Sequence, residues 1–413
     1  MKNILKTTSK FVALLIALIA VSVLPGCNDN PDEYISTVGS PKVKYVRIPD
    51  AASADSLVTH AYMGTTVALI GENLTSIKEV WFNDQQAVLN NSLITPTALI
   101  VPIPNGIPQN ITNRIYMVNA EGVTTEFAFA VDVPSPIVSS MACEYVPDGG
   151  IATINGNFFL PVDGVGAPVV IFTPNLPATE VVSYSISEIK VKVPAGAQFG
   201  HISVQSRYGT TRSKFYFRDN RGMILDWDNT NASGGWRAGV IGNSNPSGID
   251  GNYVRFQGTM AAASGATWNE DAFSFDLWGT SNGRPQGDLF TSEPAKSILK
   301  FECYVVEPWS SGALQMIFTP WATSGTNGYI GDATVPRGLW IPWEDSGTFK
   351  TEGWITVEIP LTNFKYNPSG AELKIAGAGN WGGLTFFVFG GGVDGTECTP
   401  HICIDNIRVV PAE

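Results

Sequence analysis

Positive charge and histidine are scarce in this chain, and their scarcity excludes several classes of protein. Lys and Arg number 25 among 413 residues against 37 Asp and Glu, so the formal net charge is −12. Nucleic acids and anionic membrane surfaces attract basic patches, and neither is an expected partner. The three histidines stand singly, and no set of Cys and His has the spacing of a zinc site. We therefore expect no nucleic-acid interface and no zinc centre.

Cysteine is scarce as well, with five in the whole chain. Cys27 follows an N-terminal apolar segment, and the others are Cys143, Cys303, Cys398 and Cys403. Cys398 and Cys403 are close in sequence, and exported proteins are able to form disulfides. These two thiols either form a bridge or stay free and buried, and the sequence leaves both possibilities open.

Long amphipathic helical stretches are absent after the N-terminal segment. The chain has 42 Gly and 27 Pro together with many β-branched and aromatic residues, a composition typical of short strands joined by turns. A length of 413 residues is too great for one small domain. We expect an all-β protein of several domains.

The N-terminal segment predicts export and attachment to a lipid. It begins with three lysines, Lys2, Lys6 and Lys10. The apolar residues 11–24 that follow are too few for a comfortable membrane span. A small residue directly before a cysteine, here Gly26 before Cys27, is typical of bacterial lipoprotein signals, so we expect residues 1–27 to be a signal with acylation (palmitate) on Cys27. An ordinary secretory signal with an incidental cysteine is the alternative. Residues 28–42 are expected to form a flexible tether.

A weak internal repeat organises the next part of the chain. Residues 64–74 match residues 149–159, 85 positions later, and the strand motifs after them recur in the same order. Short strands separated by turns predict two immunoglobulin-like sandwiches, at 43–133 and 134–218. The Pro-Ser-Pro sequence at 134–136 should stiffen the joint between them. The order of the motifs resembles TIG/IPT domains.

Residues 219–413 differ in composition from the repeat. They contain at least eight strand-like segments separated by long loops, which predicts a larger, jelly-roll-like β-sandwich. Within this part, residues 353–361 and 404–409 are similar to segments of carbohydrate-binding β-sandwich modules.

Tryptophan is concentrated in this last part of the chain. Ten of the 11 tryptophans follow residue 226: Trp227, Trp236, Trp268, Trp278, Trp309, Trp321, Trp340, Trp343, Trp354 and Trp381. A core needs only a few such large rings, and several of these stand in Gly-, Ser- and Pro-rich stretches typical of loops. An indole on a surface loop is suited to stacking on the apolar face of a pyranose ring.

The whole layout resembles the surface glycan-binding lipoproteins of Bacteroidota polysaccharide-utilisation systems. These proteins carry a lipid anchor, immunoglobulin-like spacers and a glycan-binding C-terminal domain, and residues 28–34 resemble the export signal that follows their lipidated cysteine. The resemblance implies a protein of the outer membrane that captures a plant-type or other β-linked polysaccharide. It also implies surface hydrolases and a TonB-dependent importer as partners, and no catalysis. The sequence does not choose among β-glucans, xyloglucan and mannans.

The glycan-binding platform is expected in three loops of the C-terminal domain. Its aromatic members are Trp309, Trp321, Tyr329, Trp340 and Trp343. Neighbouring Asn327, Glu344 and Asp345 have side chains that can bond to sugar hydroxyls. Trp354 alternates with aliphatic residues, and we expect it to pack in the core instead.

Two other functions are compatible with parts of the sequence. A jelly-roll glycoside hydrolase would need two carboxylates about 5.5 Å or 6.5–9.5 Å apart, but the acids of this domain do not fall in an ordered E-x-D-x-x-E arrangement on a strand. An adhesin or protein-interaction lipoprotein would use similar stalks, but it would not account for the tryptophans. No catalytic residue and no obligatory cofactor are expected, although Asp226, Asp228 or Asp405 could ligate a structural Ca²⁺ of the kind seen in similar modules.

Overall fold

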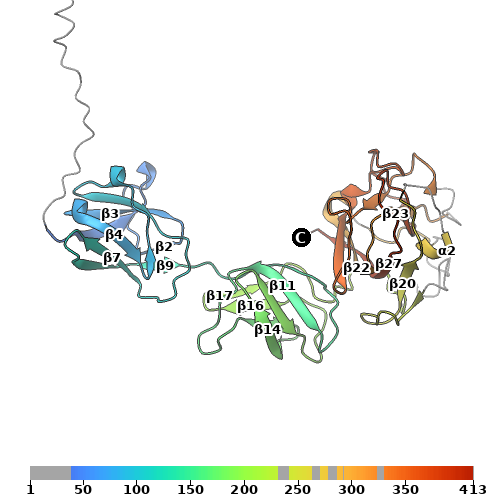
Figure 1. The fold of residues 1–413 in the computed structure, drawn as a ribbon, viewed down its shortest axis with the longest axis horizontal. Coiled ribbons are helices and arrows are strands. Elements are labelled where there is room, and N and C mark those ends of the chain that lie inside the picture. The colour runs from blue at the N-terminus through green and yellow to red at the C-terminus, as the bar shows by residue number, and fades with distance from the viewer. Residues whose placement is uncertain are drawn as a thin grey trace, which may run out of the picture. The chain divides into compact units, whose positions relative to one another are not determined.

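The computed structural model describes residues 39–230, 241–262, 270–277, 286–291, 293–322 and 330–412. The chain divides into two compact units, residues 1–133 and 134–413 (Figure 1). Strands dominate both units, so the all-β prediction is confirmed. The helical elements of the described residues are one turn of α-helix, α2 (Glu270–Phe273), and the 3-10 turns η1 (Ala51–Ser53), η2 (Leu74–Ser76), η3 (Asn91–Leu93), η6 (Pro294–Lys296) and η7 (Leu361–Asn363). None of them has the length and hydropathy needed to cross a membrane.

The first unit is an immunoglobulin-like sandwich. One sheet has the order β1 (Lys42–Arg47), β3 (Thr66–Glu72), β6 (Ala98–Pro102), and the other has the order β5 (Gln85–Gln86), β4 (Ile77–Phe82), β7 (Arg114–Asn119), β8 (Thr124–Ala128). A short parallel pair, β2 (His60–Tyr62) and β9 (Ala130–Asp132), completes the unit. Apolar residues alternate along the strands, so that Ile115 and Met117 of β7 are buried while Arg114 and Tyr116 face outward.

A second sandwich of the same kind opens the second unit. Its sheets have the orders β10 (Ile137–Met141), β11 (Ile151–Asn157), β15 (Glu188–Lys192), β14 (Glu180–Tyr184) and β13 (Leu176–Pro177), β12 (Val169–Phe172), β16 (Ser203–Ser206), β17 (Gly209–Arg212). The sequence repeat has a structural cause at Gly71 and Gly156. A β-carbon at these positions would lie 1.9 Å from the backbone oxygen of Lys42 and 1.8 Å from that of Ile137. Only glycine lets the neighbouring strand approach so closely.

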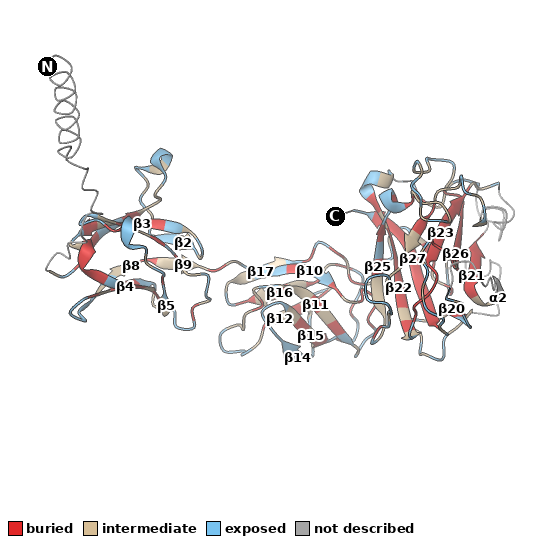
Figure 2. Cartoon of the chain, turned by 45° about the horizontal axis from the view of Figure 1, so that its top comes forward, coloured by how far each residue is buried: buried red, intermediate tan, exposed pale blue. Residues whose placement is uncertain are grey.

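The rest of the second unit is a larger two-sheet sandwich. One sheet has the order β19 (Ile241–Gly242), β20 (Tyr253–Gln257), β27 (His401–Pro411), β22 (Ser297–Glu307), β25 (Ile355–Pro360), with β18 (Met223–Leu225) also paired to β27. The other has the order β21 (Ser274–Leu277), β26 (Gly383–Val388), β23 (Leu314–Thr319), β24 (Gly338–Trp340). The central strand β27 is buried along almost its whole length, and most residues of its neighbour β22 are buried as well (Figure 2). The predicted C-terminal β-sandwich is therefore present.

The second unit contains two hydrophobic cores that meet at one place. Phe217 belongs to the core of the smaller sandwich and Ile224 to that of the larger one. Trp354 is half-buried and packs against both cores, so it packs inward as the sequence predicts, at the boundary between the two cores. Cys398 and Cys403 are free thiols, as are Cys143 and Cys303, and no bridge joins them.

Candidate functional site

Two of the predicted platform tryptophans lie in the core of the large sandwich. Trp309 is 0% exposed and Trp343 is 4% exposed. The indole N–H of Trp309 donates to the backbone oxygen of Ser311 at 2.6 Å, and that of Trp343 donates to Gly312 at 2.9 Å. The turn at 309–312 folds over the end of the sandwich and satisfies both indoles, so neither ring is available to a sugar. The prediction of a binding role is wrong for these two residues.

Trp340 belongs to the same aromatic cluster. It is half-buried in the edge strand β24, and its ring meets Phe301, Trp309 and Phe349 edge-to-face, with centroid distances of 5.8, 5.7 and 5.7 Å. Edge-to-face pairs of this kind stabilise a core. The ring therefore packs inward from the edge of the sheet and does not form part of an open platform.

Trp321 is the predicted tryptophan whose position still permits contact with a ligand. It lies just after β23, separated from that strand by Pro320, and is half-buried. A β-carbon at Gly382 would overlap its backbone nitrogen at 2.3 Å, so the chain before β26 passes close behind it. Its indole N–H has no hydrogen-bond partner among the described residues. Glu344 and Asp345 are exposed, whereas Asn327 and Tyr329 lie outside the described residues.

A hollow of about 500 Å³ is lined in part by Pro320, the residue before Trp321 in the sequence, and we call it the Pro320 hollow. Its lining comes from the end of β23, the segment before β24 and the segment before β26: Phe318, Pro320, Thr334, Val335, Pro336, Lys374, Ile375, Ala376, Gly377 and Asn380. Apolar walls with a few polar groups, in this range of volume, are typical of small-molecule sites. The ammonium of Lys374, the amide of Asn380 and the hydroxyl of Thr334 supply those polar groups.

Arg337 holds one wall of the Pro320 hollow in place. Its guanidinium is fully buried and donates to the side chain of Gln315 at 2.9 Å and to the backbone oxygens of Ile330 and Asp332 at 2.8 and 3.0 Å. Burial lowers the pKa of Arg337 to about 10, although nearby Asp332 favours the charged form. These bonds fix the segment that carries Thr334. Sequence analysis missed this residue, because a lone arginine before a short strand gives no local signal.

A second hollow lies against the other end of β24. It measures about 320 Å³ and is lined by Leu339, Ile341, Glu344, Tyr366, Gly370, Gly391 and Val393. The backbones of Arg337 and Tyr366 exchange hydrogen bonds at 2.9 and 3.1 Å, so the same residues brace both hollows. The predicted hydroxyl partner Glu344 faces this second hollow, and Asp345 is not part of its lining.

Two buried carboxylates of the second unit, Glu144 and Glu302, are committed to ion pairs. Arg408 binds Glu302 through both terminal guanidinium nitrogens, at 2.7 and 3.1 Å, and Glu144 through one of them, at 2.7 Å. Glu302 is fully buried, and that burial raises its pKa to about 7 against the opposing effect of Arg408. Neither carboxylate reaches a ligand, so the pair cannot serve as the acid and base of a hydrolase.

The aspartates considered for Ca²⁺ are engaged with protein groups. Asp226 accepts hydrogen bonds from the backbone N–H groups of residues 228–230, and Asp228 accepts two from Asn252. Asp405 is buried beside Asp250. No group of three or more His, Cys, Asp or Glu side chains in the described part of the chain has the geometry to hold a metal ion. The residues therefore do not fit the suggested calcium site.

Comparison with known proteins identifies the family. Residues 217–411 match the model of the surface glycan-binding protein B xyloglucan-binding domain. The crystal structure of the surface glycan-binding protein PbSGBP-B from Prevotella bryantii is 31% identical, covers 90% of this chain and 99% of its own, and superposes with a TM-score of 0.74. The chain belongs to the surface glycan-binding proteins. The family consists of glycan-binding proteins of the cell surface and not of hydrolases, which agrees with the binding function that the sequence predicts.

A further relative supports the identity of the immunoglobulin-like part. An IPT/TIG domain-containing protein of Bacteroides ovatus is 28% identical over 167 residues, which are 38% of this chain. The match spans about a third of the length of that relative, at 33%. This agrees with the TIG/IPT interpretation of the repeat.

Proposed function

We propose that this surface glycan-binding protein captures a β-linked glucan of the xyloglucan type through the large C-terminal sandwich. The observation that carries the proposal is the match of residues 217–411 to a xyloglucan-binding domain. The Pro320 hollow and the half-exposed Trp321 lie within the same residues. They combine apolar area with hydrogen-bonding groups, which is what an amphipathic sugar ring requires.

The binding energy must come from several sugar units. Each aromatic contact contributes about 0.5–1.5 kcal/mol beyond the area that it buries, by analogy with aromatic pairs. A micromolar dissociation constant corresponds to about −8 kcal/mol. We propose that a polymer reaches it by contacting Trp321, the Pro320 hollow and the hollow at Glu344 in succession along β24.

Three further tryptophans are candidates for contact with the glycan. Burial removes Trp227, Trp309, Trp343 and Trp381 from consideration, since each is at most 4% exposed. Trp236, Trp268 and Trp278 lie outside the described residues, and Trp236 and Trp278 stand beside Gly in the sequence. Alanine variants at these three positions and at Trp321 measure the share of each ring in glycan binding.

The N-terminus supports a place at the outer membrane. We propose that acylated Cys27 anchors the protein, that residues 28–42 act as a tether, and that the sandwiches at 43–133 and 134–218 carry the domain at 219–413. Several acyl chains anchor firmly at about 0.8 kcal/mol per buried CH₂. In this position the protein would hold polysaccharide for surface hydrolases and for a TonB-dependent importer.

Affinity electrophoresis of the unlipidated chain, residues 28–413, against xyloglucan, mixed-linkage glucan and mannan tests the proposal. Xyloglucan should retard the wild type most. Gly377→Leu should weaken binding, because Gly377 lines the Pro320 hollow and a β-carbon there meets no atom within 4 Å. Gly242→Leu is the matched control, since Gly242 is equally unobstructed and lines neither C-terminal hollow. If the wild type, Gly377→Leu and Gly242→Leu are retarded equally, the Pro320 hollow is not part of the binding site. If no glucan retards the wild type, the proposed ligand is wrong.

A further inference from the structure

The smaller and larger sandwiches of the second unit are joined by a buried network of charges. Glu144 comes from the segment after β10 and is 2% exposed. Its carboxylate binds Lys300 of β22 and Arg408 of β27, each at 2.7 Å. Its backbone N–H donates to the hydroxyl of Thr356, at 2.8 Å, and that hydroxyl donates to Glu302 at 2.9 Å. Every charge in this network faces an opposite charge, so the joint has one preferred geometry.

Backbone contacts extend the same joint. The N–H of Thr356 in β25 donates to the oxygen of Ala142 at 2.9 Å, and the hydroxyl of Tyr145 donates to the oxygen of Asp219 at 2.7 Å. The indole N–H of Trp354 donates to Ser247 at 3.3 Å, while its ring meets Tyr253 and Tyr304 edge-to-face. The walls on both sides of the joint are therefore fixed before any ligand arrives.

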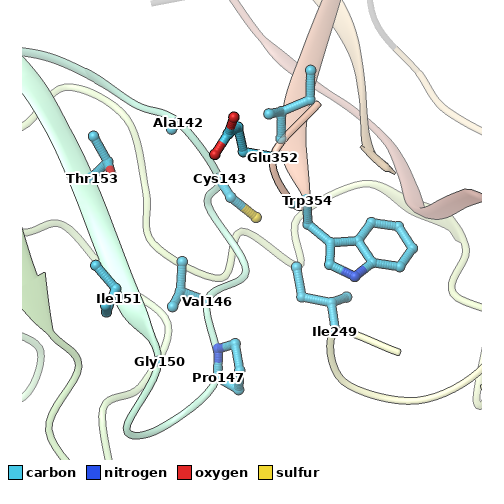
Figure 3. Close-up of a pocket in the computed structure, with 12 residues that line it drawn as sticks. Ala142, Cys143, Val146, Pro147, Gly150, Ile151, Thr153, Ile249, Glu352 and Trp354 are labelled. Carbon is cyan, nitrogen blue, oxygen red and sulfur yellow. The ribbon is translucent and has the colours of Figure 1, made fainter. Parts of the chain in front are cut away.

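A hollow of about 380 Å³ lies at this joint, and we call it the joint hollow. Figure 3 shows Cys143, Val146 and Pro147 on the side of the smaller sandwich and Ile249, Glu352 and Trp354 on the side of the larger one. Thr153 and Ile151 of β11 also line it. Most of the lining is apolar. Among the described residues, neither the carboxylate of the exposed Glu352 nor the hydroxyl of the half-buried Thr153 has a hydrogen-bond partner.

We propose that the joint hollow is a second glycan site, which takes one or two units of a neutral sugar chain. A preformed, mostly apolar hollow with part of an indole and two unused polar groups suits a ring that has an apolar face and a hydroxyl rim. The carboxylate of Glu352 accepts hydrogen bonds from hydroxyls and repels an anionic sugar. The choice of a glycan as the ligand rests on the proposed function. The site itself is separate, because none of its residues lines the Pro320 hollow.

A second site would act mainly on polymers. A long glycan that occupies both hollows makes its second contact intramolecularly, so its affinity rises above that of an oligosaccharide without any change at the first site. Filling one hollow should therefore halve the stoichiometry for a short oligosaccharide and weaken the binding of the polymer by at least about fivefold.

Calorimetry on residues 28–413 with a short xyloglucan oligosaccharide and with the polymer tests this inference. Gly353→Leu fills the joint hollow, because Gly353 lines it and a β-carbon there meets no atom within 4 Å. Gly377→Leu fills the Pro320 hollow, and Gly242→Leu is again the control. The wild type and the control should bind two oligosaccharides, each single variant one, and the double variant none.

The outcomes separate the inference from the function on which it rests. Glu352→Gln keeps the shape of the joint hollow, and we expect it to weaken polymer binding in the same direction as Gly353→Leu at an unchanged melting temperature. If Gly353→Leu and Glu352→Gln bind oligosaccharide and polymer as the wild type does, the joint hollow is not a glycan site while the proposed function stands. If the wild type binds no xyloglucan, the proposed function fails first.

Discussion

The buried carboxylate of Glu144 is central to the stability of the second unit, and replacing it tests the role of the charge network. Glu144→Gln removes one buried negative charge that faces two cations, Lys300 at 6% exposure and Arg408 at 0%. Arg408 keeps Glu302, but Lys300 keeps only the half-exposed Glu358. Neutralising one partner of a buried ion pair costs about 3–5 kcal/mol, because the remaining charge stays buried and unpaired.

The magnitude can be measured against a matched control on the same lysine. Glu358 also binds Lys300 at 2.7 Å, but its side chain is 49% exposed. Exposed pairs contribute about 0–1 kcal/mol, so Glu358→Gln should change little. In urea unfolding of residues 28–413, Glu144→Gln should lower the free energy of unfolding of the second unit by about 3–5 kcal/mol. If it costs no more than Glu358→Gln does, the buried network does not hold the two sandwiches together.

Three further predictions follow from burial, charge and the N-terminal motif. Trp309→Ala should lower the free energy of unfolding by about 3–5 kcal/mol, because it empties a fully buried site. If its melting temperature is no lower than that of Trp321→Ala, Trp309 does not lie in the core. Burial, and after it the charge of Asp250, raises the pKa of Asp405 to about 10, far above the value of about 3.9 expected in the unfolded chain. The folded state then keeps a proton that the unfolded state releases, so this group reduces stability as pH rises above 4. Asp405→Asn should therefore raise the melting temperature by an amount that grows from pH 5 to pH 8. A loss of stability in this variant, or a higher melting temperature of the wild type when Ca²⁺ is added, would mean that the carboxylates hold a cation. Cys27→Ala should move the protein from the membrane pellet to the soluble fraction, and full retention in the pellet would reveal another anchor.

Most of the fold could be predicted from strand patterns and from the spacing of glycines in the sequence. The repeat around Gly71 and Gly156 predicts two related sandwiches, because the same close approach of neighbouring strands requires glycine in both. The alternating residues of β7 and the apolar runs of β22 and β27 indicate strands with one or two buried faces. These signals are local, so they can be read without knowledge of the tertiary structure.

The site was harder to predict, because loop composition does not reveal which way a ring points. Trp309 and Trp343 stand in stretches typical of surface loops, yet the turn at 309–312 folds over the sandwich and supplies backbone acceptors for both indoles. Glu144 and Arg408 are 264 positions apart in the sequence, so no local pattern predicts that they pair. Arg337 was missed for a related reason: it donates to backbone oxygens of Ile330 and Asp332 and to the side chain of Gln315, and backbone acceptors leave no pattern in the sequence.

The central claim is that the C-terminal sandwich holds a glucan polymer without cleaving it. Titrating residues 28–413 with xyloglucan in a calorimeter, and then assaying the same cell for new reducing ends, tests both halves of that claim at once. The account predicts saturable binding by the wild type, weaker binding by Gly377→Leu, and no new reducing ends in either case. Absence of binding heat, or reducing ends that increase with time, would contradict it.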